Sequence, residues 1–173
     1  MSDISHTEIL PYQPSWNEKF QTEKARILEV FGDKSIKIEH IGSSSVEGLS
    51  SKPIIDIAVL VENHEEADSF IEPLSQLGYR FDKENSSNER HLFRKGEPTE
   101  FHLSIAYADR GGFWDRQILF RDYLRRHPEA LEEYAELKAN LLQKHPDGGD
   151  GYINGKSGFI QNVLKLAKEE KQI

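Results

Sequence analysis

The sequence predicts an α+β fold in which a mixed β-sheet carries helices packed mainly on one side. Short apolar runs with the two-residue period of strands are interspersed with longer runs of helical period. Their expected order is one helix, two strands, one helix, three strands and three helices, which differs from the strict strand–helix alternation of a parallel sheet. No internal repeat or low-complexity linker divides the chain, so we expect one domain over residues 1–173.

Composition restricts the classes of partner. The formal net charge of −8 argues against a protein that coats nucleic acid or an anionic membrane, although it leaves room for a small basic pocket. The chain has no cysteine, which excludes disulfides and thiolate zinc sites. Its N-terminus lacks the basic and apolar regions of a signal peptide, and no apolar run approaches the ~20 residues of a membrane span. We therefore expect a cytoplasmic protein.

The first half of the chain predicts a helix followed by two strands. The helix begins at Ser15 and ends at Gly32, and its buried face consists of Trp16, Phe20, Ile27 and Phe31. Ser35–Ile41 alternates as a strand, with Ile36, Ile38 and His40 on one face. Ile54–Val61 is a second strand, apolar at every position except Asp56.

A second helix is expected between Asn63 and Gly78, kinked or shortened by Pro73. Three strands follow, over Tyr79–Phe81, His91–Arg94 and Thr99–Ala106. The rest of the chain is expected to be helical over Phe113–Arg126, over Pro128–Lys144 and from Phe159 onward, with Pro146–Gly158 as a loop.

The two strands of the first half enclose the stretch with the clearest chemistry. Asp56 needs a partner, because burying an unpaired carboxylate costs several kcal/mol. Gly42 permits backbone angles that other residues avoid, and Ser43 and Ser44 add hydroxyl donors beside backbone amides, a combination suited to phosphate oxygens. Asp56 is either a functional residue or a structural brace for the amides of this turn.

This spacing resembles the nucleotidyltransferase fold, in which a Gly-Ser turn holds nucleotide phosphates and acids on the next strand hold Mg²⁺. An apolar residue, Gly42 and Ser43 are followed by twelve residues and then Asp56. The second acid expected two residues later is Ala58, and the further acid on a neighbouring strand corresponds to His102. Glu100, on the same strand face as His102, is a candidate for the missing oxygen ligand.

Asp56, Glu100 and His102 are thus the candidate ligands for Mg²⁺ or Mn²⁺, with Asp56 and His102 as candidate catalytic residues. Magnesium favours carboxylates and water, whereas a histidine suits manganese or zinc better. A single certain carboxylate is a poor two-metal site. For His102 the plain alternative is a hydrogen-bonded strand histidine without catalytic function.

Over nearly its whole length the chain resembles the GrpB family, which is assigned to the nucleotidyltransferase fold. The resemblance is carried by Tyr12–Trp16, by residues 38–59 (IEHIGSSSVEGLSSKPIIDIAV), by Leu77–Tyr79, by Arg90 with Phe93, by Phe120–Lys138 and by Tyr152, Lys156 and Phe159. Related domains fused to dephospho-coenzyme A kinase suggest nucleotide or coenzyme metabolism. Where the family commonly has His-His-Leu-His, this chain has Phe101–Ser104, which lacks two of the three histidines.

Further residues are candidates for binding an anion. Lys52 follows the Gly-Ser turn. Arg90 and Arg94 are four residues apart, an even separation that would direct both side chains to one side of a strand. His40 precedes the turn and is either a phosphate ligand or a hydrogen-bonded strand residue. We expect Arg121 and Arg125 to pair with neighbouring acids, and Lys156 to lie either in the pocket or on the surface.

Two functions from different classes remain open at this point. The first is a nucleotidyltransferase-like enzyme that binds a nucleotide or related phosphate compound and transfers a nucleotidyl group with a divalent metal. The second is a binding module that kept the pocket and lost the chemistry, which Ala58 and Ser104 favour. The acidic charge disfavours an RNA-processing transferase. The expected partner is a small phosphate ligand, and the sequence does not fix the oligomeric state.

Overall fold

The protein is described by a computed structural model that covers residues 9–147 and 149–171. Five strands form one sheet in the order β1-β2-β5-β4-β3: β1 (Ser35–Ile41), β2 (Ile55–Val61), β3 (Tyr79–Phe81), β4 (Arg90–Lys95) and β5 (Phe101–Tyr107). β2 and β5 run parallel, whereas the other three pairs are antiparallel. The mixed sheet and its helices confirm the predicted α+β class.

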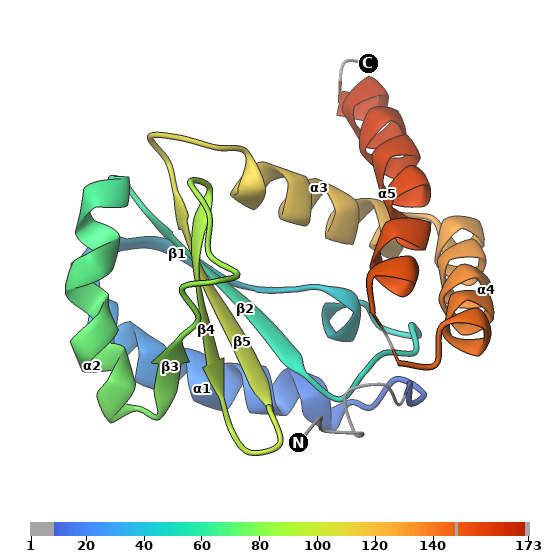
Figure 1. Ribbon diagram of the computed structural model, residues 1–173. Coiled ribbons are helices and arrows are strands. Elements are labelled where there is room, and N and C mark those ends of the chain that lie inside the picture. Colours follow the sequence, from blue (N-terminus) through green and yellow to red (C-terminus); the bar gives the residue numbers. More distant parts are fainter. Residues whose placement is uncertain (1–8, 148, 172–173) are drawn as a thin grey trace.

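One face of the sheet is covered by α1 (Ser15–Phe31), the 3₁₀ segment η4 (His64–Phe70) and α2 (Ile71–Gln76) (Figure 1). The predicted buried face of α1 packs on this side together with alternate residues of β2, among them Ile57 and Val59. The α-helix is shortened to Ile71–Gln76, as predicted, and Pro73 falls in its first turn, where the missing N–H costs no hydrogen bond. The main core therefore lies between this face and its helices.

A second apolar cluster joins α3 (Phe113–Arg126), α4 (Pro128–Lys144) and α5 (Asp150–Lys171) beside the sheet (Figure 1). Val46 and Leu49, which follow the Gly-Ser turn, are almost completely buried in this cluster. Because the turn's own continuation packs among the three helices, α4 and α5 are held next to the turn. This arrangement brings residues far apart in sequence to the end of β1.

The prediction of a loop over Pro146–Gly158 is wrong from Asp150 onward, because α5 begins there. The glycines of this segment indicated a loop from sequence, but Gly155 lies within α5 at its contact with α4. A Cβ atom at Gly155 would overlap the side chain of Leu141 on α4. The glycine thus permits close approach of α4 and α5, and tertiary packing outweighs its poor helix propensity.

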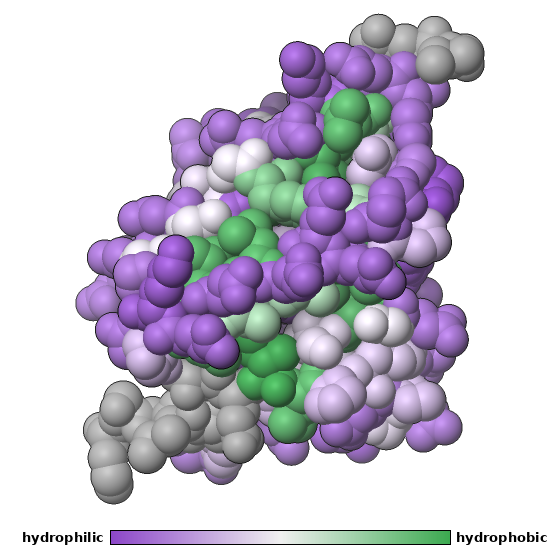
Figure 2. All heavy atoms as spheres, turned by 90° about the vertical axis from the view of Figure 1, so that its right-hand side faces the viewer, coloured by the Kyte–Doolittle hydropathy of each residue, from purple (hydrophilic) through white to green (hydrophobic). Residues whose placement is uncertain are grey.

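The surface formed by α4 and α5 is mostly hydrophilic, with a band of apolar residues across it (Figure 2). Ile153 and Leu166, both on α5, are among the exposed large apolar side chains of the protein. In the part of the chain that the structure describes, no helix combines the length and apolar character needed to cross a membrane.

Candidate functional site

The Gly-Ser turn is fixed by its close contact with β2. Gly42 has φ +73°, and a Cβ atom there would lie 2.5 Å from Oδ2 of Asp56. Any side chain would therefore be strained and would displace the carboxylate. The amides of Ser45 and Val46 donate to the carbonyls of Gly42 (3.1 Å) and Ser43 (3.2 Å), which closes the turn as a single 3₁₀ turn. The predicted juxtaposition of the turn and Asp56 is present.

Asp56, His102 and Arg94 form a chain of hydrogen bonds across three strands. The sheet register places His102 opposite both Asp56 and Arg94. Arg94 Nη1 lies 2.8 Å from His102 Nε2, and it must be the donor because a guanidinium has no acceptor. The proton of the neutral imidazole is therefore on Nδ1, which donates to Asp56 Oδ1 (3.1 Å). Arg94 also donates from Nε to Asp82 (2.7 Å). Both ring nitrogens of His102 are therefore engaged by protein groups.

The predicted metal ligands do not come together. Ala58, at the position of the expected second acid, is fully buried and pairs in register with Ser104. Glu100 is exposed, precedes β5 and lines a different hollow beside α1. Among the described residues no group of three or more His, Asp or Glu side chains is arranged to hold a metal ion. Asp56 with an already engaged His102 is a poor fit to Mg²⁺ or Mn²⁺.

A cavity of about 380 Å³ opens beside Asp56, between the sheet and the amino-terminal half of α5. It is lined by Ser43, Ser51, Lys52, Ile54, Asp56, Arg94, His102, Lys138, Tyr152, Ile153 and Lys156. The predicted site residues Ser43, Lys52, Asp56, Arg94 and His102 are thus brought to one cavity.

Three lysines give the cavity its charge, and we call them the lysine cluster: Lys52, Lys138 and Lys156. Lys138 is 4% exposed, and its Nζ donates to Ser43 Oγ (2.9 Å) and to the Ser50 carbonyl (2.9 Å). The Nζ atoms of Lys52 and Lys156 lie 5.2 Å and 4.6 Å from the centre of the Tyr152 ring. Cation–π contacts with one buried tyrosine therefore hold two of the three ammonium groups in place.

Burial and mutual repulsion disfavour the charged state of this cluster. Burial, followed by the charges of Lys156 and Lys52, lowers the pKa of Lys138 to about 7, although Asp56 acts in the opposite direction. Burial also lowers the pKa of Lys52, and burial with the charge of Lys52 lowers the pKa of Lys156. Lysines in this state gain from an anion that restores the charge balance.

Neither Lys138 nor Tyr152 was predicted as a site residue, although Tyr152 is among the residues that carry the family resemblance. Tyr152 was assigned to a loop, and Lys138 lies in a helix whose apolar stripe was recognised without it. One signal was present, because Lys138 follows Tyr134 by four residues and therefore shares the buried face of α4. A lysine on an apolar helix face indicates a buried amine with a specific partner. Lys156, left open between pocket and surface, lies in the cavity.

His40 and Ser44 lie on the other side of the turn. His40 Nε2 hydrogen-bonds with Ser44 Oγ (2.9 Å), and the ring stacks on Phe20 of α1 at 4.9 Å between centres. Burial lowers the pKa of His40 to about 4. Neither residue lines the lysine cavity; both line a second hollow. Arg90 is likewise absent from the cavity lining and donates to Ser104 Oγ (3.0 Å).

Two arginines of α3 brace the turn from that second hollow. Arg121, almost fully buried, donates from Nη1 to Glu39 (3.0 Å) and to the His40 carbonyl (2.9 Å), and from Nε to Asp122 (2.9 Å). Arg125 donates to the Ser45 carbonyl (2.7 Å). The expected pairing of Arg121 with neighbouring acids is present, and both arginines also hold the backbone of the turn.

Comparisons with known proteins agree on the family. Residues 6–166 match the family model described as GrpB protein. The UPF0157 protein YqkA of Bacillus subtilis is 39% identical over 165 residues, which cover 95% of this chain but 48% of YqkA, so the chain spans about half the length of that relative. A dephospho-CoA kinase of Mycobacterium bovis is 27% identical over 191 residues, covering 93% of this chain and 46% of the kinase.

Among solved structures, that of the conserved protein GrpB from Enterococcus faecalis has a TM-score of 0.87 and 35% identity, with 96% of this chain and 100% of that chain covered. Cid1 in complex with its short product ApU has a TM-score of 0.45 and 12% identity, with 81% of this chain and 50% of that chain covered. On the match of nearly its whole length, this chain belongs to the GrpB family.

Proposed function

We propose that this protein binds a nucleotide or a related phosphate compound in the cavity beside Asp56. The observation that carries the proposal is the position of the lysine cluster next to the Gly-Ser turn. Three ammonium groups line a cavity in which Asp56 is the only carboxylate among the residues that the structure describes, in a protein whose overall charge is −8. A concentration of cations against the sign of the whole protein favours a small anionic ligand.

Each part of the turn has a role in this proposal. Ser43 Oγ faces the cavity and is already hydrogen-bonded to Lys138, so a phosphate oxygen at this position meets a hydroxyl and an ammonium group together. Gly42 keeps the backbone close to the carboxylate of Asp56. Arg94, which is paired with Asp82, completes the lining beside His102.

Of the two functions that the sequence left open, the donor set supports the binding module. Metal-dependent nucleotidyl transfer needs carboxylates that share an ion, and Ala58 and His102 stand at the positions where further acids would be needed. In the binding module, Asp56 orients His102 and limits the positive charge of the cavity.

A thermal-shift screen tests the proposal. The panel consists of nucleoside mono-, di- and triphosphates together with dephospho-coenzyme A, which is included because of the kinase relative. A ligand at 100 times its Kd adds about 2.7 kcal/mol to the free energy of unfolding, which is a readily measured rise in Tm. At the same ligand concentration the rise should fall to about half in Lys156→Met and be kept in Lys144→Met. If no phosphate compound at millimolar concentration raises the Tm, the proposal fails.

A further inference from the structure

We propose that the cavity binds the phosphate chain of its ligand as a metal-free anion and does not read a base, with the lysine cluster supplying the positive charge. This inference rests on the proposed function and specifies its ligand class. An inorganic polyphosphate and a nucleoside triphosphate should therefore bind the cavity with similar affinity and displace each other.

The charge around the cavity supports binding without a metal. The two hydrogen bonds of Lys138 go to a hydroxyl and a carbonyl, which leave its positive charge uncompensated. Lys52 and Lys156 face the electron-rich ring of Tyr152, a weaker partner than a carboxylate. Arg94, in contrast, is neutralised by Asp82. Three ammonium groups against Asp56 leave an excess of positive charge that matches a phosphate chain carrying no cation of its own.

The donors that a metal complex would need are occupied or replaced. His102 Nε2 accepts from Arg94 and its Nδ1 donates to Asp56, so the imidazole has no free lone pair for a metal ion. Ala58 offers no oxygen. A magnesium–nucleotide complex entering this cavity would bring its cation toward three lysines, which repel it. Free magnesium should therefore compete with the lysine cluster for the ligand.

The aromatic rings of the site are also engaged. Lys52 and Lys156 both lie against the ring of Tyr152. Tyr134 has Lys138 at 5.2 Å from its ring centre and stacks on Phe159 at 5.2 Å between centres. Cations already lie against the rings of Tyr152 and Tyr134, so these rings are less available for stacking on a base, although stacking is the usual source of base affinity. Recognition is therefore confined to the phosphate chain.

Titration calorimetry with ATP, UTP and inorganic tripolyphosphate, each in EDTA and again in excess Mg²⁺, tests the proposal. In EDTA we expect the three ligands to bind with Kd values within about fivefold of one another and to displace each other. Excess Mg²⁺ should weaken each by about tenfold or more. The proposal is overturned if ATP or UTP binds only with Mg²⁺, or if tripolyphosphate fails to displace a bound nucleotide. Absence of binding in every arm would instead contradict the proposed function itself.

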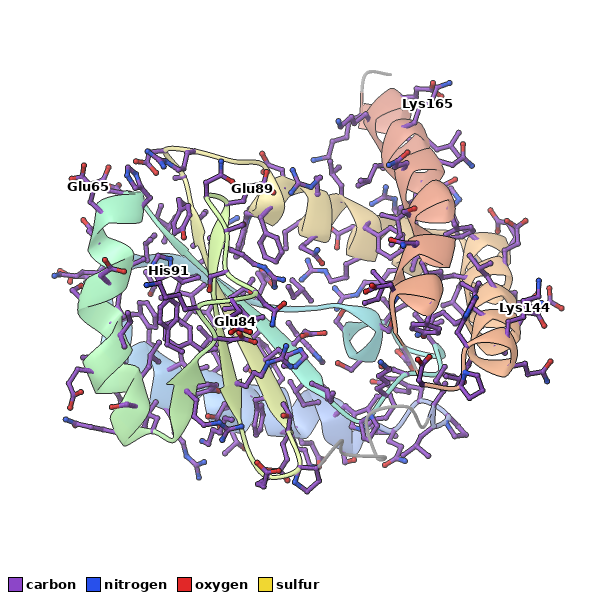
Figure 3. The ribbon with its side chains drawn as sticks, in the orientation of Figure 1. Glu65, Glu84, Glu89, His91, Lys144 and Lys165 are labelled. Atoms are coloured by element: carbon purple, nitrogen blue, oxygen red, sulfur yellow. The ribbon has the colours of Figure 1, made fainter. Side chains whose placement is uncertain are left out.

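Matched lysine variants place the binding in the cavity. Lys52→Met and Lys156→Met keep side-chain length and remove one charge each, and both residues are only half-buried, which limits the effect on folding. Each should weaken tripolyphosphate binding in EDTA by about tenfold, as for a lost charge-assisted contact. Lys144→Met and Lys165→Met are the controls, because both lysines point away from the protein body (Figure 3). Equal losses in the cavity and control variants would show only non-specific charge attraction and overturn the assignment.

Discussion

Two cationic groups flank the Gly-Ser turn, and they differ in how their charge is balanced. On the α3 side, Arg121 meets Glu39 and Asp122, and Arg125 lies 3.9 Å from Asp122 while it donates to a backbone carbonyl. On the other side, the lysine cluster shares a cavity with Asp56, which is the only acid in its lining within residues 9–147 and 149–171. The two groups lie on opposite sides of one short turn. The charge of the arginines is balanced by neighbouring acids, whereas the charge of the lysine cluster is not.

This difference separates structural cations from cations available to a ligand. The arginines satisfy carbonyls of the turn and are themselves satisfied, so their contribution is to hold the turn in place. The lysines lose solvation and repel one another, which lowers their pKa values and opposes folding. An arrangement that opposes folding is a reason to expect function, because residues that bind a ligand are often imperfectly satisfied without it. Three substitutions test this distinction.

Arg121→Met should have the largest effect on stability. It removes the ion pairs with Glu39 and Asp122 and the hydrogen bond to the carbonyl of His40. The side chain is almost fully buried, but both acids are partly exposed and regain some solvation, so we expect a loss of about 2–3 kcal/mol. Urea unfolding measures it. A loss below about 0.5 kcal/mol would show that the arginine side does not brace the turn.

Gly42→Ala should cost about 1–3 kcal/mol, because alanine is strained at φ +73° and its Cβ would overlap Asp56. It should also weaken ligand binding, since the carboxylate and the turn must separate. Gly32→Ala is a suitable control, with a positive φ of 56° but no atom within 4 Å of the added Cβ. If the two variants lose equal stability, backbone strain alone accounts for the effect and the contact with Asp56 carries no separate role.

Lys138→Met should have the smallest effect near pH 7 and the opposite sign, a gain of about 1 kcal/mol, because an unbalanced buried charge is removed while two weak hydrogen bonds are lost. The gain should depend on pH. The pKa of Lys138 is lowered from 10.5 to about 7 in the folded protein, so between these values the unfolded chain binds more protons and stability rises with pH.

The advantage of Lys138→Met over the unmodified protein should therefore be largest at pH 7 and below, and should shrink as pH approaches 10. Urea unfolding of both proteins from pH 6 to 9.5 gives the comparison, and Lys144→Met serves as the control with no such dependence. Parallel pH profiles for Lys138→Met and the unmodified protein would show that Lys138 keeps its ordinary pKa.

The elements of the fold that follow from local signals were predictable. β1, α3 and α4 have the predicted bounds, because strand alternation and helical periodicity are strong there and Pro128 marks the start of α4. The first part of α5 was missed, because Gly155 was interpreted as a loop signal, although it serves the contact with α4. Hydrophobic periodicity along one segment does not predict that a glycine is required for close packing against a neighbouring helix.

The site was predictable only where its parts lie close in sequence or in register. Gly42, Ser43 and Asp56 were found from spacing, and His102 from its place on an apolar strand, because adjacent strands carry them. His40 was assigned to the same ligand because it lies near the turn. The alternation of side chains along a strand does not show which face of the sheet carries the site. Lys138 and Tyr152 reach the cavity only through the packing of α4 and α5, which no local pattern specifies.

Lysine protection by a bound ligand tests the central claim most directly. The protein is labelled briefly with an amine-reactive acetylating reagent, with and without saturating ATP, and the modified lysines are quantified by mass spectrometry. We expect ATP to slow the modification of Lys52 and Lys156 at least severalfold and to leave the modification rates of Lys144 and Lys165 unchanged. If ATP binds, as judged by a raised Tm, yet Lys52 and Lys156 react at their original rates, the phosphate site lies elsewhere and the account is contradicted.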